Sequence, residues 1–405
     1  MAKIKSGYAL SRALTHSILD ERLDRDALSQ ILKSPVIDWM TFAVFAGQTC
    51  ITTQVWARLS QIGMTALMPD DVRQGFALVH SANADRNRYI RSKVRELGLL
   101  LNSAGISPIP LKGVALLLYG TYDEPGDRIM SDMDILIRLE QIPAALEVLA
   151  RHNYLQRCNV FAPKALASAT EFARIDCSDF RNAPDRPGHH LSGIKPTADD
   201  HVLFELHRRV VKDTHDAGGR LNASALVNLH SVTIDGVQYE MLSKEFVFLH
   251  TLHHAYASGD TLDLGLTDYR HLIDADRLLK AIASDGDFST LLSLVSEIGF
   301  EDKLTFFLWQ AEEVLGTNSM PHWKPSANGL ALIKKFKHVR RSHKAYLMRK
   351  WWIGFNKRRV RYLNASFLRQ TYGELPFYRT IPLYSRYLLG KLLLQTRKLA
   401  EKANH

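Results

Sequence analysis

Residues 131–139, SDMDILIRL, restrict the fold more than any other part of the sequence. Their alternation of polar and apolar side chains predicts a β-strand, because side chains two residues apart in a strand point to the same face. One face would carry Asp132 and Asp134. The other face would carry Met133, Ile135 and Ile137. Two carboxylates about 7 Å apart on one face repel each other. The segment therefore predicts a strand with one buried face and a cation near the other.

A second strand is predicted in HVLFELHRRV, residues 201–210, and it would supply a third acid. Its alternation puts Glu205 on one face together with His207. Three oxygen ligands suit Mg²⁺, and a pair of ions ~3.5–4 Å apart can hold both oxygens of an in-line phosphoryl displacement. We therefore predict that Asp132, Asp134 and Glu205 are metal ligands, with His207 beside them in a substrate role or as a hydrogen-bonded core residue.

A Lys-Gly turn precedes the first of these strands, in LKGVALLLYG. Gly113 would allow the backbone to approach a phosphate closely, and the N-terminus of the helix that follows attracts anions. Lys112 and Arg128 would then neutralise charge on a triphosphate. A simpler role is also open for Arg128, as the ion-pair partner of Asp127 or Asp132.

The rest of the chain is predicted to be largely helical. Helical spacing of apolar residues predicts helices within residues 7–103, including a long one over 69–105, and again after about residue 240, where 288–316 looks like one amphipathic run. The ISPIPLKG segment would be a short strand near a sheet edge, because proline cannot donate to a central ladder.

The predicted fold class is therefore α/β (α+β), with a small mixed β-sheet core between helical regions. The predicted divisions are a helical region at 1–104, the α/β core at 105–240, a helical region at 241–330 and a basic helical tail at 331–405.

Composition excludes several classes of protein. A hydrophobic fraction of 46% over 405 residues is enough for a sizeable core, but no run approaches the ~20 apolar residues of a membrane-spanning helix. The three cysteines, Cys50, Cys158 and Cys177, form neither a disulfide framework nor a zinc pattern, and the N-terminus lacks the pattern of a secretion signal, so we expect a cytoplasmic protein. P-loop, dinucleotide-binding and serine-hydrolase motifs are not found.

The net charge of +10 comes from the C-terminal tail, which has 19 Lys and Arg against two acids from residue 334 onward. Aromatic residues lie among these bases: Trp351, Trp352, Tyr362 and Phe367. This composition suits RNA, an anionic membrane surface, or a solvated helix whose aromatic side chains pack on the body.

Histidines gather in the predicted helices after residue 240. The cluster is His250, His253, His254 and His271, together with Asp274. No pair has the spacing with a Glu that zinc hydrolases show. A packed helical region with polar edges is the preferred interpretation over a metal site, and some of these side chains could line an acceptor cleft.

Together these motifs resemble the polymerase-β-like nucleotidyltransferase superfamily, and more closely a bacterial family of uncharacterised nucleotidyltransferases in which Lys-Gly replaces the usual Gly-Ser. The order LKGVALLLYG, Arg128, SDMDILIR, ELH and HH…YRHLIDADRLL carries the likeness, which covers most of residues 20–300. Its specific residues are Lys112, Gly113, Arg128, Asp132, Asp134, Glu205 and His207. The 18 residues between Gly113 and Asp132 exceed the superfamily's usual spacing.

The resemblance implies a Mg²⁺-dependent enzyme, with two ions, that moves a nucleoside monophosphate from an NTP such as ATP to an acceptor and releases pyrophosphate. Asp132, Asp134 and Glu205 would hold the metal, and Gly113 would lie on the nucleotide-binding turn. The acceptor could be a small molecule, a peptide, a protein or RNA. The alternative is a non-catalytic binding protein on the same fold, whose basic tail holds RNA or an anionic membrane.

Overall fold

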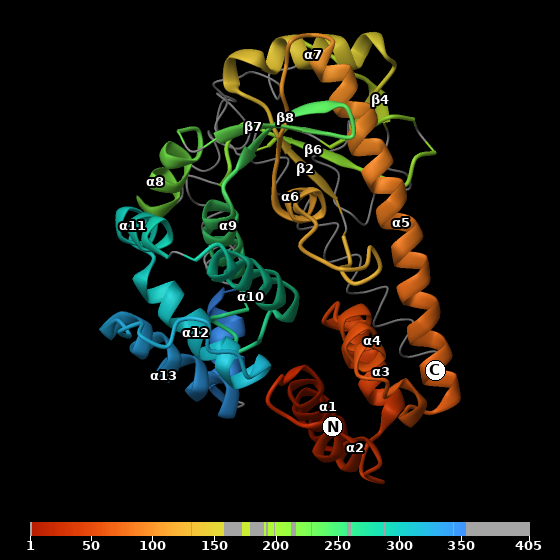
Figure 1. Cartoon of the computed structure of the whole chain (residues 1–405), viewed down its shortest axis with the longest axis vertical. Coiled ribbons are helices and arrows are strands. Elements are labelled where there is room, and N and C mark those ends of the chain that lie inside the picture. Colours follow the sequence, from red (N-terminus) through yellow and green to blue (C-terminus); the bar gives the residue numbers. More distant parts are fainter. Residues whose placement is uncertain are drawn as a thin grey trace.

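The computed structural model describes residues 2–353, apart from residues 131, 158–171, 179–189, 192, 198, 212–215, 228, 257–260, 287 and 343. In this part of the chain, a mixed β-sheet lies at one end of the molecule and helical regions lie at the other (Figure 1). The predicted α/β fold class, a small mixed sheet with helices before and after it, is confirmed.

The N-terminal region is helical, as the sequence predicts. Its helices are α1 (Ala2–Leu19), α2 (Arg25–Leu32), α3 (Trp39–Gln48), α4 (Thr52–Gln61), the 3₁₀ turn η1 (Thr65–Leu67) and α5 (Asp70–Asn102). Carboxylates of Asp24 and Asp38 cap α2 and α3 by accepting from backbone N–H groups in the first turn. The long α5 runs from these helices to the sheet and so connects the two ends of the molecule (Figure 1).

The main sheet has six strands in the order β1-β2-β6-β5-β3-β4. They are β1 (Ile109–Pro110), β2 (Met133–Leu136), β3 (Leu155–Arg157), β4 (Phe172–Arg174), β5 (Ile194–Lys195) and β6 (Phe204–His207). The adjacent interior strands β2 and β6, the central strands of the candidate site, are parallel, and the other pairs are antiparallel. The short strand that contains Pro110 is at the edge, as proline requires.

The two faces of the central strands are covered by different elements. The apolar residues Met133, Ile135 and Ile137 pack into a core with α5 and α7 (Ile142–Arg151), which follows the 3₁₀ turn η2 (Leu139–Gln141). Leu136 lies on the opposite face, in the core that contains Leu116 of α6 (Lys112–Tyr119). The predicted alternation of β2 is therefore confirmed, and Asp134 shares the face of Leu136.

A second, two-stranded sheet follows α8 (Asp216–Ala225) and was missing from the sequence prediction. It is a hairpin of β7 (Leu229–Ile234) and β8 (Val237–Leu242). Asp235 and Gly236 form its turn with φ values of +52° and +81°, as a type I′ turn needs. The Glu240 N–H donates to the Pro108 carbonyl at 3.2 Å, so β8 lies beside the edge strand β1.

The C-terminal region is helical. Its helices are α9 (Lys244–Tyr256), α10 (Tyr269–Ser284), α11 (Ser289–Ile298), α12 (Glu301–Leu315) and α13 (Ala327–Arg341). The single helical run expected over 288–316 is wrong. Gly299, at φ +75°, ends α11 with a left-handed residue, and α12 begins two residues later. Among the described helices, none is both long and apolar enough to cross a bilayer.

Candidate active site

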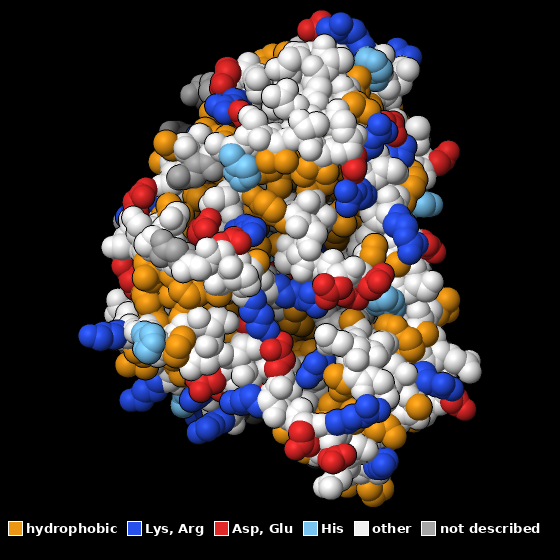
Figure 2. Space-filling view, viewed as in Figure 1, with side chains coloured by type: hydrophobic (Ala, Val, Ile, Leu, Met, Phe, Trp, Pro, Cys, Tyr) orange, Lys and Arg blue, Asp and Glu red, His pale blue; other side chains and the backbone are white. Residues whose placement is uncertain are grey.

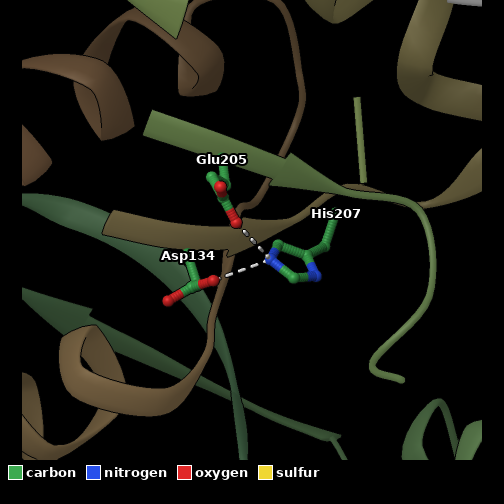
Figure 3. A group of neighbouring side chains, drawn as sticks. All are labelled: Asp134, Glu205 and His207. Carbon is green, nitrogen blue, oxygen red and sulfur yellow. Dashed lines mark hydrogen bonds and ion pairs between the residues drawn. The ribbon is translucent and has the colours of Figure 1, made fainter. Parts of the chain in front are cut away.

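Two acids predicted to be metal ligands face each other across the central strand pair. Because β2 and β6 run parallel, their register places Asp134 directly opposite Glu205. His207 follows on the same face of β6, and one ligand atom from each of the three side chains lies within 4.8 Å of the others. Figure 3 shows both carboxylates directed toward the same ring nitrogen of His207. In the described part of the chain, no other group of His, Cys, Asp or Glu side chains comes together in this way.

Asp134 is the most strongly held of these acids. It is only 2% exposed, and its Oδ1 accepts hydrogen bonds from Lys112 Nζ at 2.6 Å and from His207 Nε2 at 2.8 Å. Burial alone would raise the pKa of Asp134, but the His207 hydrogen bond and the Lys112 charge outweigh it and lower the pKa far below its usual range. Asp134 therefore stays a carboxylate.

Glu205 and Asp132 lie nearer the solvent. The Glu205 side chain is 25% exposed, and its Oε2 is 3.9 Å from His207 Nε2. Asp132 is half-buried and directly precedes β2. The structure thus brings Asp134, Glu205 and His207 together, and the carboxylate of Asp132 is outside that 4.8 Å group.

The Lys-Gly turn is the first turn of α6, whose N-terminus adjoins β2. Lys112 has φ +45°, a left-handed conformation that is uncommon for a residue with a side chain. The next residue cannot be larger than glycine without movement, because a Cβ on Gly113 would lie 2.7 Å from Arg128 Nη1 and 3.3 Å from Met130 Cε. In this structure, the absence of a side chain at Gly113 leaves space for the Arg128 guanidinium.

Gly113→Ala is expected to lower the free energy of unfolding by about 1–3 kcal/mol, because the added methyl group overpacks a buried guanidinium. Urea unfolding of the two proteins measures the change. The matched control is Gly75→Ala in α5, where an added Cβ meets nothing within 4 Å and the better helix propensity of alanine stabilises. Equal stability of Gly113→Ala and the native protein would contradict the packing described here.

Arg128 is buried and its ion-pair partner comes from the C-terminal region. Its Nε and Nη2 each donate to the Asp274 carboxylate at 2.8 Å, and Tyr122 Oη donates to the same carboxylate at 2.5 Å. The neighbouring Asp127 instead accepts from His80 at 2.9 Å, so it is not the partner of Arg128. Burial works against the charged form, but the Asp274 charge prevails and raises the pKa of Arg128.

The predicted histidine cluster is packed between α9 and α10. His253 stacks on Phe300, and the ring of His254 lies 4.6 Å from that of His271. His250, His253 and His271 are buried, so these rings are packed within the helical region. A small cavity of about 10 Å³, room for roughly one water molecule, joins the cluster to the candidate site. It is lined by Lys112, Leu116, Arg128, His250, Thr251, His254, His271 and Asp274.

The histidine cluster predicts a loss of stability in acid. Burial, followed by the charges of His271 and Lys112, lowers the pKa of His254 to about 3, although Asp268 opposes this. In the unfolded chain the pKa of this group is near the ordinary histidine value of 6.5, so between these values the unfolded state binds the extra proton. From pH 7 to pH 5 the free energy of unfolding should therefore fall by about 1–2 kcal/mol through this group alone.

Denaturant unfolding at pH 7 and pH 5 tests this expectation. His254→Gln should show a smaller fall than the native protein, whereas His322→Gln, which replaces an exposed histidine, should keep the full fall. The same pH dependence in all three proteins would mean that His254 does not stay neutral in the folded state.

The described part of the basic tail is helical. It comprises α13 and helical residues 344–353, in which Trp351 and Trp352 are 65% and 47% exposed. The other two aromatic residues of the predicted tail pattern, Tyr362 and Phe367, lie outside the described residues. Lys and Arg side chains also gather near the middle of the face in Figure 2, between the sheet and the helical regions.

Sequence reasoning missed three residues around this site. The sequence pattern places Asp274 in the histidine cluster, although it holds Arg128, and no motif singles out Tyr122. His190 pairs with His207 in an isolated bridge, and the two rings lie 5.6 Å apart. No short-range pattern signals these contacts, since Arg128 and Asp274 are 146 residues apart.

Comparison with known proteins gives one match. A family model described as "Uncharacterised nucleotidyltransferase" matches residues 35–316. No curated protein and no solved structure matches the chain. The matched range includes both central strands, the Lys-Gly turn and Asp274.

Proposed function

This chain belongs to the uncharacterised nucleotidyltransferase family, and on that premise we propose that it moves a nucleoside monophosphate from an NTP to an acceptor with release of pyrophosphate. The observation that carries the proposal is the in-register pairing of Asp134 with Glu205 on parallel strands, beside His207. Carboxylates that converge on one point are costly to hold together unless a cation joins them.

The donor set fits a divalent ion. Two carboxylates and an imidazole lie within 4.8 Å of one another, and oxygen-rich groups of this kind suit Mg²⁺ or Mn²⁺. We assign Asp134 and Glu205 as ligands, with Asp132, which directly precedes β2, as the ligand that would allow a second ion. Bound there, the metal would neutralise charge on the phosphates and favour the deprotonated acceptor.

The remaining residues would bind and orient the substrate. The N-terminus of α6 and the Lys112 ammonium, which is 2.6 Å from Asp134, lie where a triphosphate next to these carboxylates would need positive charge. Arg128, packed against Gly113, would add a second cation. His207 would hold the Asp134 carboxylate in orientation through its 2.8 Å hydrogen bond, and the more exposed Glu205 would face the acceptor.

In the transfer, an acceptor oxygen or nitrogen would form a bond to the α-phosphorus of the NTP. The bond between that phosphorus and the oxygen that bridges the α- and β-phosphates would break. Pyrophosphate would leave in line, on the side of Lys112 and the α6 N-terminus, and the acceptor proton would pass to solvent on the Glu205 side. A small molecule or a peptide is our preferred acceptor among the classes considered, and ATP is one of the candidate donors.

The test is direct. Purified protein is incubated with Mg²⁺ or Mn²⁺ and each α-labelled NTP in turn, together with cell-extract metabolites as acceptors, and pyrophosphate release is followed. We expect metal-dependent pyrophosphate release with at least one NTP. If no NTP binds in the presence of either ion, the protein is not a nucleotidyltransferase of the kind proposed.

The alternative role is non-catalytic binding of RNA or an anionic membrane by the basic tail. The exposed Trp351 and Trp352 among Lys and Arg residues support an anion-binding surface. The carboxylate pair at Asp134 and Glu205 favours the catalytic role, because a protein that only binds polyanions gains nothing from negative charge at its centre. Nucleotide binding that needs neither a metal nor Asp134 would favour the alternative.

A further inference from the structure

Asp274 is a buried carboxylate of the C-terminal helical region that has no part in the proposed transfer step. It is fully buried on α10, yet it reaches the candidate site through Arg128. Three donor atoms converge on it: Nε and Nη2 of Arg128, both at 2.8 Å, and the hydroxyl of Tyr122 at 2.5 Å. This arrangement fixes both the plane and the direction of the guanidinium.

The third guanidinium nitrogen of Arg128, Nη1, is the one that lies beside the Lys112–Gly113 turn. Nη1 of Arg128 is not bonded to Asp274, and it lies 2.7 Å from the point that a Cβ on Gly113 would occupy. The same cavity wall contains Lys112, whose ammonium is held by Asp134. The two cations beside the turn are thus each paired with a buried carboxylate. Lys112 is paired with Asp134 of the sheet, and Arg128 is paired with Asp274 of α10.

We propose that Asp274, supported by Tyr122, is a positioning residue that holds Arg128 against the Lys112–Gly113 turn, so that the C-terminal helical region completes the triphosphate subsite. This inference rests on the proposed function. The ligand would be the β- and γ-phosphates of an NTP at the N-terminus of α6, and the guanidinium would act on them as a fixed positive charge behind the Gly113 backbone while Nε and Nη2 remain on Asp274.

A purely structural role does not account for the arrangement. A buried ion pair is weak evidence for stability, because an apolar pair of similar volume often serves a core as well. Here the pair instead places a fixed N–H donor against a glycine at the start of a helix. A lysine at position 128 would keep the charge but lose the planar fork that orients it.

The experiment measures nucleotide affinity, metal affinity and turnover of full-length variants. Asp274→Asn and Arg128→Lys are compared with Asp276→Asn, a matched control two residues along α10. Asp276 is also buried and accepts from Thr317 at 2.7 Å and from Lys280 at 3.0 Å, but it does not contact Arg128. The probes are a non-hydrolysable ATP analogue with Mg²⁺ for nucleotide binding, and Mn²⁺ alone for the metal.

We expect Asp274→Asn and Arg128→Lys to weaken binding of the analogue by about tenfold or more and to raise KM in proportion. Binding of Mn²⁺ alone should change less than about twofold in these variants, because Asp134 and Glu205 are untouched. Asp276→Asn should leave both affinities unchanged. A general loss of structure would lower the metal affinity as well, so the pattern separates positioning from folding.

If Asp274→Asn does not fold, Tyr122→Phe tests the positioning role instead, because it removes one hydrogen bond to Asp274 and keeps the charges of Arg128 and Asp274 balanced. It should raise KM for the nucleotide about threefold with little change in kcat. Folded Asp274→Asn or Tyr122→Phe with native nucleotide affinity would overturn the positioning role alone. If the native protein itself binds no NTP with Mg²⁺, the proposed function fails instead.

Discussion

Asp134→Asn is expected to lower the rate of nucleotidyl transfer by about a thousandfold or more. The native carboxylate is almost fully buried, and Lys112 and His207 both bond to its Oδ1. The substitution keeps the shape of the side chain but removes the charge that a metal and Lys112 both need. Pyrophosphate release with a labelled NTP, at saturating metal, measures the loss.

Two further variants make that result interpretable. Glu205→Gln should lose activity in the same assay, because Glu205 is the register partner of Asp134 on β6. Glu240→Gln should stay active, since that carboxylate is on β8, outside the Asp134–Glu205–His207 group, and pairs with Arg138 at 2.8 Å. If the Asp134→Asn protein folds, binds nucleotide and turns over at the native rate, the Asp134 carboxylate has no role in the reaction.

Arg128→Met is expected to produce a large loss of stability, about 3–5 kcal/mol in the free energy of unfolding, because it leaves the Asp274 carboxylate buried without its counter-charge. Denaturant unfolding of the variant measures this loss. The same substitution at Arg91, whose pair with Asp235 is 44% and 42% exposed, should change stability by less than about 1 kcal/mol.

The double variant Arg128→Met/Asp274→Leu tests the cause. It replaces both charges by apolar groups, so it should recover most of the stability that Arg128→Met loses. Nucleotide binding should not recover, because the cation beside the turn is still missing. A double variant that is as unstable as Arg128→Met would show that the loss comes from packing and not from the buried charge.

The alternation and spacing of residue types along the sequence were enough to predict those parts of the fold that depend on residues close together in the chain. The two-residue alternation correctly placed Asp134 on the face of β2 opposite Met133 and Ile135, and Glu205 with His207 on one face of β6. Proline correctly put β1 at an edge. The start of α5 followed from Pro69 and the acids after it.

Some missed elements did carry a local signal. An Asp-Gly pair at 235–236 lies between alternating segments, which is a strong indication of a hairpin, and it marks the β7–β8 turn. Gly299 similarly marks the boundary between α11 and α12. By contrast, β3 and β5 are only three and two residues long, so their alternation is too short to distinguish from a loop.

The contacts around Arg128 could not be predicted from local pattern. Its partner Asp274 is 146 residues away, and the pairing exists only because α10 packs beside the turn that begins α6. The same holds for Lys112 and Asp134, which the sequence assigned to different tasks but which lie 2.6 Å apart. Residue type indicated the chemistry, whereas tertiary packing decided the partners.

The most direct test of the central claim is a crystal structure of the protein with Mn²⁺ and a non-hydrolysable NTP, in which anomalous scattering locates the metal. We predict an anomalous peak within coordination distance of the Asp134 and Glu205 carboxylates, with the triphosphate at the N-terminus of α6. A metal bound elsewhere, or a nucleotide held away from Lys112 and these two acids, would contradict the assignment of this site.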